Sequence, residues 1–334
     1  MIGEHPDIPA AAVAAAVARG WGVAVTGAEH LPLGAGAWHW SVGDDTGPQW
    51  FATLHAVESA EDRQARLASY DAAARLARRL SFVVAPVHTR DGRVAVDLAP
   101  GRLLTLTPLL EGDAVGHGAV TDDAGRSVVA NMMGDLHRQR RLRHLPTWRP
   151  RIGRHGRDRR RELLHCLENG HWSGGPWSGP AARLVTDAAP VLRQAVRRFT
   201  LLGAAVSGGL ERWVVSHGRP DASNIVRTPD GHRLVDWGAL ALAPRERDLR
   251  LALADAESGE PWFSYLEAGG VPEPLAPDAL ELFALEQHLT EVTEHTLRFA
   301  GRHGDGPDER RCFGELEREL GALLGRWGGG APVS

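Results

Sequence analysis

The sequence contains no lysine, because every residue counted as Lys+Arg is an arginine. The chain therefore cannot form the lysine Schiff base of pyridoxal-phosphate enzymes, complete a P-loop Walker A motif, or place the usual ATP-binding lysine of a protein kinase. A drift of composition towards Arg, Ala and Gly is the simplest cause. Arginine remains charged and binds phosphate bidentately, so anion binding is not excluded.

Other scarce features narrow the class of protein further. Two cysteines, Cys166 and Cys312, are too few for a disulfide framework or a cysteine-rich metal site. There is no apolar run of about 18 residues, so we expect no membrane span. The first seven residues lack the pattern of a signal peptide, and we expect a cytoplasmic protein. A net charge of −4 argues against a dedicated nucleic-acid binder.

The order of elements predicts an α+β protein. Residues 20–110 read as short strands around one helix, and most of the chain beyond them has helical periodicity. We therefore expect an N-terminal lobe over 1–110 and a helical C-terminal lobe over 111–330. The expected strands are 23–25, 38–42, 50–54, 82–84, 94–98 and 103–106; the expected helices are 7–20, 60–79, 121–142, 157–169, 180–205, 247–257, 278–300 and 310–327.

The segment 213–237 carries the clearest chemical signal. It reads as a strand, a polar loop, and two strands joined by a turn at Pro229-Asp230-Gly231. Such a hairpin places Asn224 beside the end of the strand that leads to Asp236. Their side chains offer two oxygen ligands, which suits a magnesium ion that also holds phosphate oxygens.

This segment resembles the aminoglycoside phosphotransferase family, whose signature is His-Gly-Asp-x-His-x-x-Asn followed after about ten residues by Ile/Val-Asp-Trp/Phe. The sequence matches this signature at His217, Gly218, Asn224, Asp236 and Trp237. The runs 31–42, 175–180 and 242–249 resemble the spectinomycin-phosphotransferase-like branch, and the resemblance covers roughly residues 20–300. It implies a bilobal, protein-kinase-like fold with a small β-rich N-lobe and a larger, mostly helical C-lobe.

The resemblance also implies roles for individual residues. Asn224 and Asp236 correspond to the magnesium ligands, and Asp248 to an acid that orients the catalytic loop. Residues 107–111, with Pro108, Leu109 and Leu110, correspond to the hinge that pairs with the nucleotide base. An active enzyme of this kind would use Mg²⁺ with ATP or GTP and a small-molecule acceptor; a protein that has lost the activity would need no cofactor.

Two departures separate this chain from the family pattern. Arg219 stands where the family has its catalytic base, and an arginine cannot remove a proton from a hydroxyl because its pKa is above about 12. Asp221 is either a displaced base or the partner of Arg219, and Arg219 itself could face the γ-phosphate. Thr53 replaces the lysine of the third strand and is expected to touch the nucleotide without supplying charge. His217 either organises the loop or carries a proton.

Three functions follow as alternatives. The first is phosphorylation of a hydroxylated antibiotic or secondary metabolite. The second is a binding or partner module, without phosphotransfer, in a biosynthetic complex. The third is a nucleotide-independent reaction on a natural product, with Asp221 and a neighbouring histidine as the acid/base pair.

Several weaker signals complete the sequence reading. Trp172, Trp177 and Trp262 would suit an aromatic or apolar substrate. The short run 34–36 reads as a turn, and His165, Cys166 and His171 do not have zinc-site spacing. The arginine-rich segment 138–161 reads as a solvated face, or alternatively as a contact for a polyanionic partner.

Overall fold

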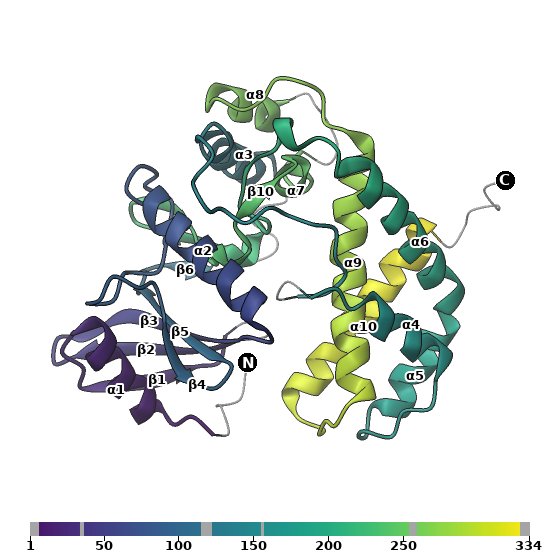
Figure 1. Cartoon of the computed structure of the whole chain (residues 1–334), viewed down its shortest axis with the longest axis horizontal. Coiled ribbons are helices and arrows are strands. Elements are labelled where there is room, and N and C mark those ends of the chain that lie inside the picture. Colours follow the sequence, from purple (N-terminus) through teal and green to yellow (C-terminus); the bar gives the residue numbers. More distant parts are fainter. Residues whose placement is uncertain (1–6, 34–36, 115–121, 155–156, 254–258, 328–334) are drawn as a thin grey trace. The chain divides into compact units, whose positions relative to one another are not determined.

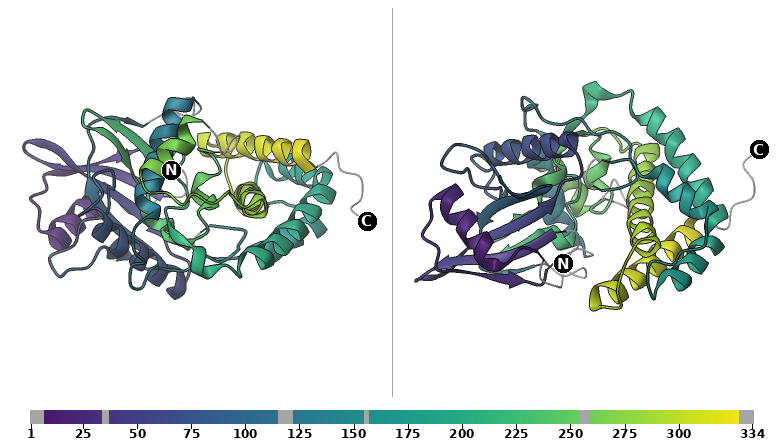
Figure 2. Two further views of the ribbon diagram at one scale, coloured as in Figure 1. Left: turned by 90° about the horizontal axis from the view of Figure 1, so that it is seen from above. Right: turned by 60° about the horizontal axis from the view of Figure 1, so that its bottom comes forward.

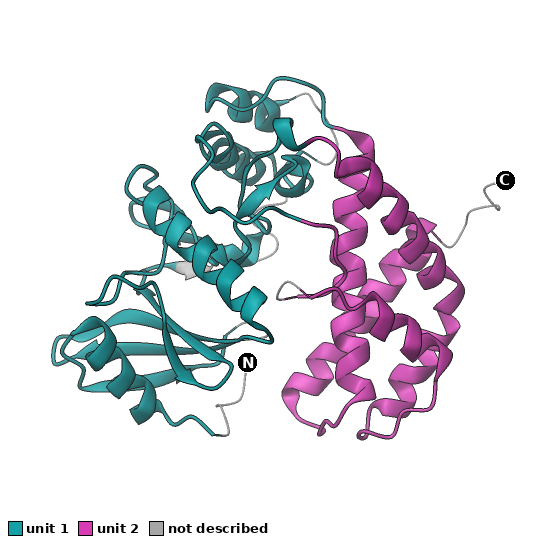
Figure 3. Ribbon diagram, in the orientation of Figure 1, with its two compact units in different colours: residues 1–148, 210–275 teal, residues 149–209, 276–334 magenta. Residues whose placement is uncertain are grey.

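The chain forms a five-stranded antiparallel sheet followed by a largely helical region, which confirms the predicted α+β class (Figure 1). The computed structural model describes residues 7–33, 37–114, 122–154, 157–253 and 259–327. Its contacts divide the chain into two compact units, shown in Figure 3: unit 1 comprises residues 1–148 and 210–275, and unit 2 comprises residues 149–209 and 276–334. The lobe boundary expected at residue 110 is a separate division and stays a prediction.

The sheet of unit 1 has the strand order β1-β2-β3-β5-β4. The turn between β2 and β3 follows from its sequence, because the Asp44 carboxylate accepts hydrogen bonds from the backbone and hydroxyl of Thr46. In the register of the long central strands, His39 of β2 and Thr105 of β5 both lie opposite Thr53 of β3. The strands are β1 (Gly27–Leu31), β2 (Ala37–Asp44), β3 (Gly47–Ala56), β4 (Val96–Ala99) and β5 (Arg102–Pro108).

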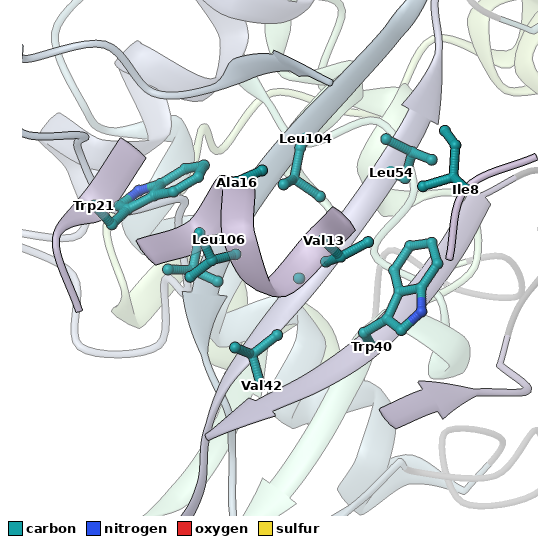
Figure 4. Packing of buried hydrophobic residues seen from close by; sticks show 11 residues of the cluster. Ile8, Val13, Ala16, Trp21, Trp40, Val42, Leu54, Leu104 and Leu106 are labelled. Carbon is teal, nitrogen blue, oxygen red and sulfur yellow. The ribbon is translucent and has the colours of Figure 1, made fainter. Parts of the chain in front are cut away.

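Helix α1 (Ala10–Trp21) covers one face of this sheet (Figure 4). Its alanines allow close approach, and Val13 packs with Trp40, Leu54 and Leu106 in one buried cluster. Strand side chains alternate between faces, so Thr53 and its neighbours of the same parity project from the opposite face. Helix α2 (Ala60–Leu76) meets that opposite face, and the Tyr70 hydroxyl there lies 2.9 Å from His55 Nε2. One face of the sheet is thus a core, and the other is lined by polar groups.

The remainder of unit 1 supports the polar loop. The hairpin β8–β9 pairs with β6, and β7 pairs with β10 in a separate two-stranded sheet. These elements are α3 (Asp123–His137), β6 (Asp113–Ala114), β7 (Val214–Ser216), β8 (Ile225–Thr228), β9 (Gly231–Leu234), β10 (Ala241–Ala243), α7 (Glu246–Leu249) and α8 (Glu260–Glu267). One short 3-10 turn, Ala222–Asn224, precedes the hairpin, and another, Trp237–Ala239, follows it.

Unit 2 is a bundle of helices, seen from two sides in Figure 2. It consists of α4 (Arg160–Glu168), α5 (Ser178–Asp187), α6 (Ala189–Val206), α9 (Pro277–Ala300) and α10 (Pro307–Trp327). Several arginines of the segment 138–161 are engaged within it: Arg154 pairs with Glu291 at 2.5 Å and Arg159 with Glu294 at 3.4 Å. These ion pairs favour a packing role for that part of the segment. None of the described helices combines the length and the apolar character that a membrane crossing requires.

Some predicted boundaries are wrong. Residues 23–25 form no strand, since Gly22 ends α1 in the left-handed conformation and the ladder begins only at Gly27. Asp7 does not cap α1, because Pro9 occupies the N-cap position. The helix expected over 180–205 is two helices, and Pro190, which lacks an N–H, lies in the first turn of the second. The strand at 82–84 is a single bridge of Val83 to Leu234, and α8 was not expected.

The buried side of the sheet yields a stability prediction. Replacing Leu54, which has no exposed surface, by alanine should lower the free energy of unfolding by about 2–5 kcal/mol through lost burial and the cavity left behind. Leu33→Ala, at a half-exposed side chain of the same unit, should cost well under 1 kcal/mol. Urea denaturation of both variants measures the difference, and equal costs would contradict the packing described.

Candidate functional site

One buried carboxylate, that of Asp248 in α7, anchors the polar loop after β7. Its Oδ2 accepts a hydrogen bond from the backbone N–H of His217 at 2.9 Å, and its Oδ1 accepts one from the N–H of Gly218 at 2.6 Å. The Ser216 hydroxyl donates to Oδ1 at 3.1 Å. These bonds fix the start of the loop, as expected of an acid that orients it.

A buried histidine completes this anchor. His137 of α3 has Nε2 3.1 Å from Asp248 Oδ2 and Nδ1 3.0 Å from the hydroxyl of Tyr265 in α8. Burial alone would raise the pKa of Asp248, but the hydrogen bond from His137 and the nearby charge of Arg247 outweigh it and hold this pKa below its usual value. Asp248 is thus a carboxylate at neutral pH. It is held by His137 of α3, by Ser216 of β7 and by the loop that follows β7.

His217 organises the loop from within. Its Nε2 lies 3.0 Å from the carbonyl of Val235, and its Nδ1 accepts from the N–H of Arg219 at 3.2 Å. Its ring packs edge-on against Trp237, with centroids 4.6 Å apart. Burial lowers the pKa of His217, so the ring is neutral and both nitrogens are committed to the backbone. These contacts favour loop organisation over proton transfer.

Gly218 has a local reason to be glycine. Its φ is +99°, and a Cβ there would lie 2.6 Å from the guanidinium of Arg247. Arg247 in turn donates to the carbonyl of Ala239 at 3.1 Å. Within the run 242–249, which resembles the branch in sequence, Arg247 and Asp248 therefore support the loop.

Asn224 lies where the hairpin begins, with its amide oriented by the loop. Its Nδ2 donates to the carbonyl of Arg219 at 2.9 Å, and its backbone carbonyl accepts from the N–H of Val235 at 2.9 Å. The first bond uses the amide nitrogen and leaves Oδ1 as the side-chain acceptor. The second places Asp236, the next residue, beside Asn224, as the hairpin argument predicts.

Asp236 has an unusual backbone and an exposed carboxylate. Its φ of 61° makes it one of two non-glycine residues with positive φ in the described part of the chain. Among the described residues its carboxylate has neither a hydrogen bond nor an ion pair, and its side chain is exposed. A strained residue that presents an unpartnered carboxylate is typical of a functional position.

Arg219 and Asp221 lie together at the outer edge of the loop. Arg219 Nε is 3.5 Å from Asp221 Oδ2, and about half of the arginine side chain is exposed. Asp221 Oδ1 also accepts from the backbone N–H and the hydroxyl of Ser223, so it caps the 3-10 turn. Both of its oxygens are engaged, which favours pairing and capping over the role of a displaced base.

The position of the missing lysine is occupied by a neutral pair. Thr53 Oγ1 lies 3.2 Å from Nδ1 of His39, whose ring stacks on Phe51 with centroids 5.0 Å apart. Burial lowers the pKa of His39 to about 4, although the negative charge of Asp236 opposes this shift. The Thr53–His39 pair therefore brings no positive charge to this face of the sheet at neutral pH.

A cation that the sequence reading missed comes instead from α2. The side chains of Arg66 and Tyr70 converge on Gly238, where a Cβ would lie 3.1 Å from Arg66 Nη1, 3.1 Å from the Tyr70 hydroxyl and 3.6 Å from Asp236 Oδ1. Arg66 is 8% exposed, and its Nη2 lies 3.7 Å from Asp62. The sequence around Arg66 does not indicate a site residue, because only the fold brings α2 to the turn Asp236-Trp237-Gly238 (the Asp-Trp-Gly turn).

The expected hinge follows β5 directly. Pro108 has no N–H, and the N–H of Leu109 donates to the carbonyl of Gln49 at 2.9 Å. Three residues are expected to meet a nucleotide base. Among them, only Leu110 has a backbone N–H that makes no hydrogen bond to another described residue.

Two of the three tryptophans singled out from sequence pack within their own unit, and the third makes a local hydrogen bond. Trp262 is buried and packs on Tyr265, while Trp177 packs on Phe313 with centroids 4.8 Å apart and donates to Asp305. Trp172 donates to the carbonyl of Asn169. The turn expected at 34–36 lies outside the described residues.

Solved structures place this arrangement in a known fold. A spectinomycin phosphotransferase in complex with ADP and spectinomycin superposes with a TM-score of 0.71 at 13% identity, covering 95% of this chain and 98% of that one. The chain has the fold of the aminoglycoside phosphotransferases. An amicoumacin kinase in complex with AMP-PNP and Ca²⁺ shares this phosphotransferase fold (TM-score 0.62, 15% identity, 94% and 92% coverage), as does a microcompartment-associated aminopropanol kinase (0.59, 13%, 93% and 95%).

No family model and no curated protein matches the sequence. At these identities the phosphotransferase fold is established, whereas substrate and catalytic status are separate questions.

The Asp248 anchor generates a stability prediction with a defined pH dependence. Asp248→Asn would turn an amide N–H₂ towards backbone donors and should cost about 3 kcal/mol at pH 7. Because the pKa of Asp248 is lower in the folded state, its stabilisation is complete above about pH 4 and is lost as the pH falls through the folded-state value. The difference between wild type and variant should therefore shrink only in acid.

The matched control is Asp230→Asn, at an exposed turn carboxylate of the hairpin. It should change stability by less than about 0.5 kcal/mol at either pH. Denaturant unfolding at pH 7 and pH 3.5 measures both variants. A cost for Asp248→Asn that matches the control would show that the anchor is dispensable.

Proposed function

We propose that this protein binds a magnesium–nucleoside triphosphate and transfers its γ-phosphoryl group to a hydroxyl of a small molecule, an antibiotic or secondary metabolite. The observation that carries the proposal is the backbone hydrogen bond from Val235 to Asn224, which brings Asp236 beside Asn224 at the base of the hairpin. The loop that Asp248 anchors holds the amide nitrogen of Asn224, and the side chain of Asp236 is exposed. The likeness to kinases solved with ADP or AMP-PNP supports the choice of ligand.

The donor set suits magnesium. Asn224 offers Oδ1, because its amide nitrogen is bound to the loop, and Asp236 offers an exposed carboxylate. Mg²⁺ prefers such oxygen ligands and completes its shell with water and substrate phosphates. Bound there, the ion would neutralise charge on the phosphates. The backbone of Asp236 is strained where it presents the carboxylate, and binding of a cation would offset the cost of this strain.

The phosphates need a second source of positive charge, and we propose that Arg66 supplies it. The Thr53–His39 pair is neutral, whereas the guanidinium of Arg66 is permanently charged and lies at the Asp-Trp-Gly turn. An arginine can hold two phosphate oxygens at once. The helix would thus take over the phosphate-binding charge that this fold usually carries on the sheet.

Transfer would proceed without a strong general base. The acceptor oxygen forms a bond to the γ-phosphorus, the bond to the nucleoside diphosphate breaks, and the hydroxyl proton leaves to solvent. General-base assistance is worth about 10²–10⁴-fold, while positioning and charge stabilisation carry most of phosphoryl transfer. The capped, arginine-paired state of Asp221 therefore predicts a slow enzyme.

A second function, nucleotide-dependent binding without transfer, is favoured by the same Arg219–Asp221 pair. With a cation in the base position and the nearest acid engaged, the loop offers no group that is poised to take a proton. Such a protein would bind its small molecule or a biosynthetic partner without chemistry.

Nucleotide binding tests the site shared by both functions. Excess Mg-ATP at one hundred times its Kd should stabilise the wild type by about 2.7 kcal/mol, measured as a rise in Tm. Asp236→Asn removes a charged ligand, and a tenfold weaker Kd would leave about 1.4 kcal/mol at the same concentration. Asp230→Asn, on the same hairpin, should shift like the wild type. The absence of a shift with every nucleoside triphosphate would contradict the proposal.

Phosphate transfer separates the two functions. Labelled γ-phosphate should appear on a hydroxylated acceptor in a panel of antibiotics, and Arg219→Asp should raise the rate by restoring a base. If wild type and Arg219→Asp both bind Mg-ATP but neither transfers phosphate to any acceptor or to water, the binding function is the correct one.

A further inference from the structure

A cluster of metal-ligand side chains lies within unit 2, and none of its members belongs to the candidate functional site. Helices α9 and α10 pack against each other there (Figure 1). Glu291 and His295 are four residues apart on α9, and Cys312 and Glu315 are three apart on α10, so each pair shares one helix face. Two facing helices that each contribute two ligand-type residues are a recurring way to build a metal site in a bundle.

The donor atoms of three of these residues converge. One ligand atom each from His295, Cys312 and Glu315 all lie within 4.8 Å of one another. His295 Nε2 is 3.3 Å from Glu315 Oε2 and 3.9 Å from Glu291 Oε2. Tetrahedral zinc ligands stand about 3.5 Å apart, given metal–ligand distances of about 2.0–2.3 Å. Small rotamer adjustments are enough to reach that geometry.

The histidine supplies an independent sign that the cluster is incomplete. His295 is 6% exposed, and its Nε2 is buried without a hydrogen bond from any described residue, although it lies close to two carboxylates. A buried polar atom without a hydrogen bond costs about 1–3 kcal/mol and usually has a specific explanation. Cys312 is equally buried, at 5% exposed. A metal ion would satisfy both side chains at once.

The surrounding arginines orient the carboxylates without filling the centre. Arg311 Nη1 donates to Glu315 Oε1 at 3.0 Å, and this bond turns Oε2 towards His295. Arg154 holds Glu291, which therefore borders the cluster and is not counted among the ligands. Hydrogen bonds of this kind fix ligand orientation around protein-bound metals.

We propose that His295, Cys312 and Glu315 bind one zinc ion, which joins α10 to α9. One nitrogen, one thiolate sulfur and one carboxylate oxygen form the mixed set that zinc prefers over magnesium or calcium. The thiol proton is released to solvent on binding. Glu291 borders the fourth position, which a water molecule would fill. The ion would bridge two helices within unit 2 and raise the stability of that unit.

Cobalt(II) titration of the full-length, chelator-treated protein tests the site, since a cobalt–thiolate bond gives an intense near-ultraviolet absorption. We expect one Co²⁺ per chain with this band, displaced by Zn²⁺, and a Tm raised by Zn²⁺. Cys312→Ser and His295→Gln should each weaken binding by about 100-fold or more, and Cys312→Ser should lose the thiolate band. Cys166→Ser, at the other buried cysteine, should bind like the wild type.

Each alternative outcome is decisive. A thiolate band that persists in Cys312→Ser, or that disappears in Cys166→Ser, places the ion elsewhere and overturns the proposal. So does weak binding without one-to-one stoichiometry in the wild type. Circular dichroism without metal checks that the variants fold. A folded Cys312→Ser protein whose Tm no longer responds to Zn²⁺ supports the site.

Discussion

The carboxylate of Asp248 is the constraint on which the rest of the candidate site depends. It is fully buried, is ionised at neutral pH, and accepts hydrogen bonds from the N–H groups of His217 and Gly218. Those two residues fix the loop that leads to Asn224, and the hairpin beyond it delivers Asp236 to the same place. The positions of Asn224 and Asp236 are therefore fixed by hydrogen bonds of the loop and the hairpin. Such preorganisation is what phosphoryl transfer requires most.

The missing lysine acquires a physical meaning within this scaffold. A drift from lysine to arginine would have left an arginine at position 53, but the strand carries threonine there, paired with a neutral histidine. The cation nearest to the turn at Gly238 is Arg66 on α2, and it is the one that we propose for the phosphates.

The sequence was sufficient for the parts of the molecule that local patterns encode. The alternation of strands and turns, the hairpin at Pro229-Asp230-Gly231 and the juxtaposition of Asn224 with Asp236 all follow from spacing. The break between α5 and α6 and the late start of β1 did not, because they depend on one proline and on which segment finds a ladder partner. The sequence did not predict the position of Arg66 or the cluster of His295, Cys312 and Glu315 either. Tertiary packing alone brings their partners within reach.

We propose that Arg66 supplies the phosphate-binding charge in a site built on Asn224 and Asp236. Calorimetric titration with Mg-ATP of Arg66→Met and of Arg63→Met tests it most directly, because Arg63 lies one turn away on the same helix and pairs with Asp97 at the surface. We expect Arg66→Met to remain folded and to bind Mg-ATP at least about tenfold more weakly, a loss of about 1.4 kcal/mol, while Arg63→Met binds like the wild type. Equal affinity of the two variants would contradict the claim.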